Sequence, residues 1–242
     1  MSVFASLTII VLAMLIQSFL ELSPGVFACF YHHALGKVPA KKADDRSLSF
    51  ILGVEICVAV VFLATYIVVN FFIVKCGLKS PIFFWVMSGI FFLEAIIAFF
   101  FYYRPARLIK PKKSAKNSTA LFIPRPLAKS LIYHAENAKN RSGAITLGFI
   151  TCALELIFTL PLYIIASVSI FYAPISANFL FIIIYIIVAT LPLFIIRTLF
   201  RTDHNLVEIQ RIRIKKKLPT KLVLFFGFLA LSIITLITGF SL

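Results

Sequence analysis

Charged residues are scarce in this chain, since Asp, Glu, Lys and Arg make up 14% of its 242 residues. An average soluble domain is about a quarter charged and about half apolar, whereas this chain is 61% hydrophobic. Apolar runs of about 18 or more residues recur, and each is long enough to cross a ~30 Å hydrocarbon core. No polar stretch is long enough to fold as a second, soluble domain. These features predict an all-α integral membrane protein.

Several functional motifs are also absent from the sequence. There is no P-loop, zinc signature or nucleophile elbow, which disfavours an ATPase or a soluble-type hydrolase. We therefore expect neither an enzyme nor a bound cofactor. The sequence contains no motif that identifies a metal. No Lys or Arg precedes the first apolar run at Val3, so a cleavable signal peptide is not expected. The net charge of +15 requires no nucleic acid partner, because basic residues beside membrane spans attract anionic lipid.

Six apolar segments separated by charge clusters predict six transmembrane helices. They are Val3–Leu35, Leu48–Val74, Pro81–Tyr103, Gly143–Phe171, Ser176–Phe200 and Leu222–Phe240. A continuous helix over the first segment would be about 50 Å long and would overshoot the bilayer. We therefore expect Pro24-Gly25 to divide it into a helix and a half-helix or re-entrant turn, and Pro161 to interrupt the fourth.

The charge distribution divides the chain into two halves. Residues 1–103 and 143–242 each contain three spans, and the basic loop 104–142 separates them, so the halves have inverted topology. Of the 24 Lys and Arg residues, 22 lie in alternate loops. The positive-inside rule then predicts a multi-pass cell-membrane protein with both termini outside the cytoplasm. In this scheme Asp44 and Asp45 are loop charges that balance Lys41, Lys42 and Arg46. The sequence does not determine the oligomeric state, and a homo-oligomer is one possibility.

Four carboxylates inside the spans are the candidate binding residues: Glu21, Glu55, Glu94 and Glu155. From the cytoplasmic ends they lie about 10–21 Å deep at helical rise. An acidic residue facing lipid at that depth costs on the order of 3 kcal/mol, so these side chains are expected to face the bundle interior. Protons, a cation, a basic substrate or polar side chains would neutralise them. The alternative is that they only hydrogen-bond between helices.

A short repeat relates the two halves. Phe19-Leu20-Glu21-Leu22 precedes Pro24, and Ala153-Leu154-Glu155-Leu156 precedes Pro161. In secondary transporters, inverted repeats with broken helices hold substrate near the midplane, where the break frees backbone groups that bind ions. The sequence therefore predicts a substrate or ion site at Glu21, Pro24, Gly25, Glu155 and Pro161, with Glu55 and Glu94 extending the polar path.

These segments resemble a known family. Leu154-Glu155-Leu156 with Thr159-Leu160-Pro161-Leu162-Tyr163 resembles the Glu-Leu-Pro-Thr-Ala-x-Pro-Tyr signature of the Sap/GAP sulfolipid- and peptidoglycolipid-addressing proteins, within the lysine-exporter (LysE) superfamily. Tyr185 with Ala189-Thr190-Leu191-Pro192-Leu193 resembles that family's Tyr-Asn-x-x-Phe-x-x-Pro-Leu segment. Ile157, Phe158 and Ile186 depart from the pattern. The resemblance implies a six-helix secondary transporter that exports a small molecule, an ion or an envelope lipid.

Two other functions remain open. CcdA-type proteins, which the superfamily also resembles, pass reducing equivalents across the membrane with one cysteine in each half, here Cys29 and Cys152. Neither cysteine lies beside its proline or beside a charge that would stabilise a thiolate, and Cys57 and Cys76 are interpreted as structural. The third candidate is a non-transporting membrane scaffold for envelope-lipid assembly. Loss of the cysteines would abolish only the relay, and loss of the glutamates would leave the scaffold intact.

Overall fold

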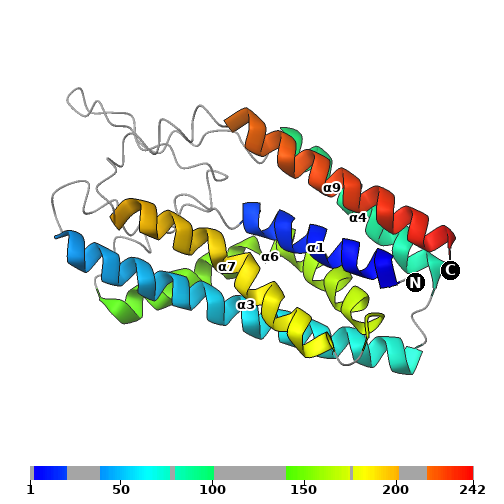
Figure 1. Ribbon diagram of the computed structural model, residues 1–242, viewed down its shortest axis with the longest axis horizontal. Coiled ribbons are helices and arrows are strands. Elements are labelled where there is room, and N and C mark those ends of the chain that lie inside the picture. Colours follow the sequence, from blue (N-terminus) through cyan, green and yellow to red (C-terminus); the bar gives the residue numbers. More distant parts are fainter. Residues whose placement is uncertain are drawn as a thin grey trace.

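The computed structural model describes residues 3–20, 39–76, 80–100, 140–174, 177–201 and 217–241, and within these ranges the chain forms helices and no strands (Figure 1). The helices are α1 (Val3–Leu20), α3 (Ala40–Cys76), α4 (Pro81–Phe100), α6 (Arg141–Phe171), α7 (Asn178–Arg201) and α9 (Lys217–Phe240). The all-α prediction is confirmed for the described part of the chain.

Four of these helices, α3, α4, α7 and α9, are long and apolar enough to cross a membrane. The two arms of α6 make a fifth if the bent helix is counted as one span, and α1 is apolar but shorter. Large apolar side chains face outward on every helix, for example Ile67, Phe92 and Phe179, and a water-soluble protein rarely exposes such continuous apolar surface. The chain is thus a multi-pass membrane protein, and a count of six spans stays a prediction.

Helix α3 begins earlier than the hydropathy pattern predicts. It starts at Ala40 rather than near Leu48, and its 37 residues are about 55 Å long at helical rise. Because this exceeds the ~30 Å core, the first two turns extend beyond it. Asp44 and Asp45 lie on these turns, so their assignment to a loop is wrong. The local cause is that polar residues at a span's end do not stop a helix when neither Gly nor Pro intervenes.

Small residues hold α3 and α6 in close parallel contact. On each helix these small residues recur every four positions. They are Ser49, Gly53 and Cys57 on α3, and Ala144, Gly148 and Cys152 on α6. A Cβ on Gly53 would overlap the carbonyl oxygen of Ile145, and a Cβ on Gly148 would overlap that of Phe50. Such spacing lets helix backbones approach in a membrane, where packing replaces the hydrophobic effect. We call this contact the α3–α6 seam.

Helices α4 and α9 form a second, antiparallel pair. Ser88 Oγ donates to the carbonyl oxygen of Ser232 at 2.8 Å, and Ser232 Oγ donates to that of Ser88 at 2.9 Å. Phe91 stacks on Phe228 one turn away, with ring centroids 6.4 Å apart. Helix α1 lies between the two pairs and contacts α6, α7 and α9. Hydroxyl bonds and ring packing thus join elements that are far apart in the sequence.

Helix α6 is bent by 76° between its arms Arg141–Ala153 and Phe158–Phe171. Its first turn is capped by Asn140, whose Oδ1 accepts from the Gly143 N–H at 2.9 Å. Pro161 lies inside the second arm. Proline has no N–H for the carbonyl four residues earlier, here Ile157, and its ring crowds that carbonyl. The bend lies on the N-terminal side of Pro161, as this mechanism requires.

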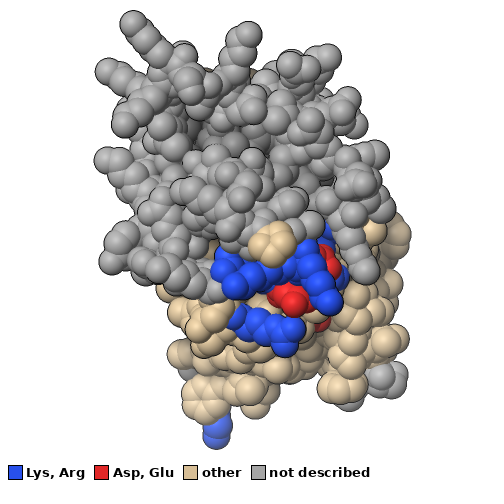
Figure 2. Space-filling model, turned by 90° about the vertical axis from the view of Figure 1, so that its left-hand side faces the viewer, with Lys and Arg blue, Asp and Glu red and all other residues tan. Residues whose placement is uncertain are grey.

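The two ends of the bundle differ in charge. Helix α1 begins and helix α9 ends at the same end of the bundle in Figure 1, while α3 and α6 begin at the other end. Figure 2 shows Lys and Arg gathered around Asp and Glu at that other end. There Arg197 Nε lies 2.9 Å from Asp44 Oδ1, and Arg141 Nη2 lies 3.3 Å from Asp45 Oδ2. Both ion pairs join α3 to a helix of the second half.

Candidate functional site in the bundle core

A polar contact of three helices lies inside the apolar core. Gln17 Nε2 of α1 donates to the hydroxyl of Tyr163 on α6 at 2.6 Å, and the hydroxyl of Tyr185 on α7 donates to Gln17 Oε1. All three side chains are fully buried. A buried amide or hydroxyl is stable only when it is hydrogen-bonded. The three residues therefore fix one another, and we call them the Gln17 centre.

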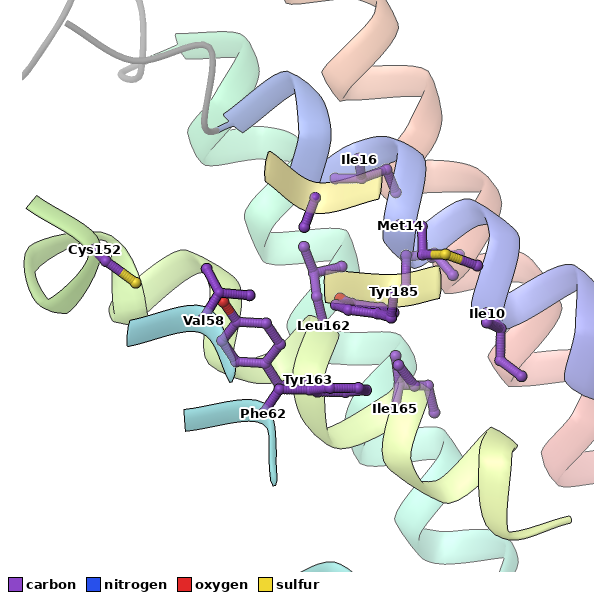
Figure 3. Close-up of a cluster of buried hydrophobic side chains, with 14 of the residues drawn as sticks. Ile10, Met14, Ile16, Val58, Phe62, Cys152, Leu162, Tyr163, Ile165 and Tyr185 are labelled. Carbon is purple, nitrogen blue, oxygen red and sulfur yellow. The ribbon is translucent and has the colours of Figure 1, made fainter. Parts of the chain in front are cut away.

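Aromatic rings frame the Gln17 centre. Phe62 of α3 stacks on Tyr185, with ring centroids 4.3 Å apart and planes inclined by 14°, and its centroid lies 5.6 Å from that of Tyr163. Figure 3 shows these three rings entering one cluster from α3, α6 and α7, next to Met14 of α1. Four helices, two from each half, thus enclose the polar group, which is consistent with a site shared between the halves.

The polar contacts continue along α1 toward α7. Ser18 Oγ lies 2.8 Å from the carbonyl oxygen of Val188 and 2.8 Å from that of Met14. Val188 lies one turn beyond Tyr185 on α7. Helix α1 therefore presents two consecutive polar residues to the second half, at the end of the helix that precedes Glu21 in the sequence.

The structure places the predicted carboxylates in different surroundings. Glu155 is half-buried and lies between the two arms of α6, where its carbonyl oxygen accepts from Thr159 Oγ1 at 3.3 Å. Glu94 is 6% exposed on α4, and its Oε2 has no hydrogen-bond partner among the described residues. Glu55 is half-buried on α3. The described residues contain no group of three His, Cys, Asp or Glu side chains that could hold a metal.

The first-repeat residues Glu21, Pro24 and Gly25 lie outside the described residues, as does Cys29. Their placement at the centre stays a prediction. Gln17 was not among the predicted site residues. Its signal in the sequence was a lone amide in an apolar run, four residues and so about one helical turn before Glu21. Tyr163 and Tyr185 belong to the two segments that carry the family resemblance, and the fold brings them to the same amide.

Among the described residues, Cys152 has a cysteine neighbour that the proposed relay does not include. Cys152 lies against Cys57 of α3, and the two side chains interact. Both are buried, and neither is in a disulfide. Cys57 therefore has a redox-capable neighbour, although the sequence alone favoured a structural role for it.

No protein-family model, no curated protein and no solved structure matches the chain.

Proposed function

We propose that this protein is a secondary membrane transporter that exports a small molecule, an ion or an envelope lipid, coupled to a proton or cation at intramembrane glutamates. The observation that carries the proposal is the Gln17 centre, where polar side chains of both halves meet inside an apolar core. A bundle with no role beyond packing in lipid needs no buried polar side chains, because burial of a polar group costs free energy unless the group is hydrogen-bonded. The amide and the two phenols contain both donors and acceptors, which a polar substrate group would engage by replacing their mutual hydrogen bonds.

The bend of α6 supports a binding site next to this centre. Pro161 deprives the Ile157 carbonyl of its helical donor, and Glu155 lies between the two arms. In transporters, broken helices expose such carbonyls to the transported ion near the midplane. Glu155 and the freed carbonyl are oxygen ligands, which suit a proton or a hard cation. Tyr163 is two residues beyond Pro161, so the bend and the Gln17 centre belong to one region of α6.

The pattern of helix contacts supports two inverted halves. In such a repeat α1 corresponds to α6, α3 to α7 and α4 to α9. Each of these corresponding pairs is in contact, as expected near a two-fold axis. The α3–α6 contact has its counterpart in α1–α7, and α1–α9 has its counterpart in α4–α6. The resemblance to the LysE superfamily and its Sap/GAP branch implies the same arrangement and the direction of export.

The test is substrate-driven charge movement in proteoliposomes. The purified protein is reconstituted with an imposed pH gradient, and currents are recorded on a solid-supported membrane for amino acids, metal salts and lipid-headgroup analogues. We expect at least one class to evoke a pH-dependent current that E155Q reduces at least tenfold and E94Q weakens. The control is D45N, which changes an exposed carboxylate outside the core. A substrate current that survives both Gln variants would disprove glutamate coupling.

The alternatives predict different results in the same assay. A scaffold gives no substrate current in the parent protein, and its folding tolerates loss of the glutamates. A thiol relay requires Cys152, whereas the proposed transporter retains its current in C29S/C152S. A current abolished by C29S/C152S and unchanged in E155Q would therefore favour the relay.

A further inference from the structure

The α3–α6 seam ends in a pair of cysteines. Cys57 and Cys152 lie one helical turn beyond Gly53 and Gly148, at corresponding positions of two parallel helices. They are 1% and 3% exposed, and their side chains contact each other. We propose that Cys57 and Cys152 form a redox-active dithiol, which a lipid-soluble quinone oxidises to a disulfide between the two halves of the protein.

The seam geometry brings the backbones of α3 and α6 close together one turn before the two cysteines. A disulfide requires Cα atoms about 4.4–6.8 Å apart, which most helix pairs exceed because larger side chains separate the backbones. Here the glycines one turn earlier allow a backbone approach that any Cβ would prevent. The thiols already contact each other, so bond formation requires a side-chain rotation and a small approach rather than a rearrangement of helices.

The surroundings of the pair select the chemical class of the oxidant. Cys57 lies nine residues beyond Leu48, where the apolar part of α3 begins, which places it about 14 Å into the hydrocarbon core. Charged thiol oxidants such as glutathione disulfide do not enter that layer. The neighbouring Ile56 and Val60 are 51% and 55% exposed on the lipid-facing side. A quinone dissolved in the bilayer therefore approaches to within one side chain of the thiols.

The reaction balances with the quinone as the only oxidant. The S–H bonds of Cys57 and Cys152 break, and one S–S bond forms. Two electrons and two protons pass to the quinone, whose two carbonyl oxygens become the hydroxyls of the quinol. The attacking sulfur reacts as the thiolate, and its proton and that of the second thiol end on the two oxygens of the quinol. This chemistry is independent of the proposed transport.

The experiment uses the single cysteine of the second half. The chain has four cysteines, and only Cys152 follows the basic loop 104–142. A specific protease site is inserted in that loop, and the full-length protein in liposomes is treated anaerobically with ubiquinone-1. It is then alkylated and cut. We expect the halves to stay joined near 27.2 kDa without reductant, to separate with dithiothreitol, and one quinol to form per chain.

Matched variants identify the bond. The halves should separate in C57S and in C152S, and stay joined in C76S and C29S. Halves that stay joined in C57S would overturn the pairing. Joining by diamide but not by ubiquinone-1 would overturn the quinone as oxidant. Separation in the parent after both oxidants would overturn the dithiol itself.

Discussion

At the residue scale, the amide of Gln17 is held at both its nitrogen and its oxygen. Its amide lies in a helix with no charged residue, yet it is fully buried and bonded to two phenols. A buried hydrogen bond contributes only about 0.5–1.5 kcal/mol net, but an abandoned buried polar group costs about 1–3 kcal/mol. The Gln17 centre therefore contributes more to the specificity of helix packing than to stability. Its hydrogen bonds form at only one rotation of α1 against α6 and α7.

Removal of one hydroxyl tests this constraint. We expect Y185F to lower the free energy of unfolding by about 1–3 kcal/mol, because Gln17 Oε1 loses a buried donor. The measurement is thermal or denaturant unfolding in a fixed detergent. The matched control is Y66F, since the only hydrogen bond to the Tyr66 hydroxyl among the described contacts is long, 3.4 Å from Asn178. Equal stability of Y185F and Y66F would contradict an ordered Gln17 centre.

At the element scale, the α3–α6 seam and the bend of α6 are consequences of Gly and Pro. Glycine permits close backbone approach, and proline removes one helical hydrogen bond. Both act at fixed positions of α6: Gly148 in the first arm and Pro161 in the second. The first arm therefore packs closely against α3. The second arm is turned by 76° from it and carries Tyr163, which contacts α1 and α7.

Added methyl groups in the seam should separate the helices. We expect G53A or G148A to lower the free energy of unfolding by about 1–3 kcal/mol or more, because the new Cβ meets backbone atoms that cannot rotate away. The control is G89A on α4, where a Cβ has no neighbour within 4 Å. That change should be neutral or stabilise by up to about 1 kcal/mol. Similar losses in G89A and G53A would indicate that the seam is not closely packed.

At the scale of the whole molecule, ion pairs join the halves at the basic end. Asp44 and Arg197 are mostly buried, with side chains 20% and 19% exposed, whereas Asp45 and Arg141 are 45% and 76% exposed. The difference in burial decides how much each pair contributes to the free energy of unfolding, because water screens exposed pairs and they contribute about 0–1 kcal/mol. Of these two pairs, the Asp44–Arg197 pair should contribute measurably to the stability of this end.

Alanine substitutions at two neighbouring residues of α3 distinguish the contribution of the buried ion pair from that of the exposed one. D44A should lower the free energy of unfolding by about 1.5–3 kcal/mol, because a mostly buried guanidinium loses its carboxylate. D45A should change it by less than about 1 kcal/mol. The charge swap D44R/R197D should recover part of the loss. Equal effects of D44A and D45A would show that the inner pair is not formed in the membrane.

Reporter fusions test the orientation of the whole bundle. Because 22 of the 24 basic residues lie in alternate loops, alkaline phosphatase fused after Leu242 should be active and green fluorescent protein there should be dark. The same reporters inserted in the loop 104–142 serve as the control and should give the reverse result. A fluorescent C-terminus would overturn both the orientation and the six-span count.

The sequence by itself determined the membrane class, the helical architecture and the break near Pro161. These properties depend on local chemistry: the length of an apolar run, the missing N–H of proline and the cost of charge in lipid. The same reasoning placed all four span glutamates inside the bundle. Of the three that the structure describes, Glu94 is buried, and Glu55 and Glu155 are half-buried. The reasoning failed at the start of α3, because charges at the end of a span do not themselves end a helix.

Only the tertiary structure decided which side chains meet. The bonds of Gln17 join residues 146 and 168 positions apart in the sequence. The contact of Cys57 with Cys152 likewise depends on two glycines in different halves. Hydropathy gives the span of a helix but not its rotation about its own axis, and that rotation decides which neighbour each side chain contacts. Close packing of small residues sets the rotation here, and that packing exists only once the helices have assembled.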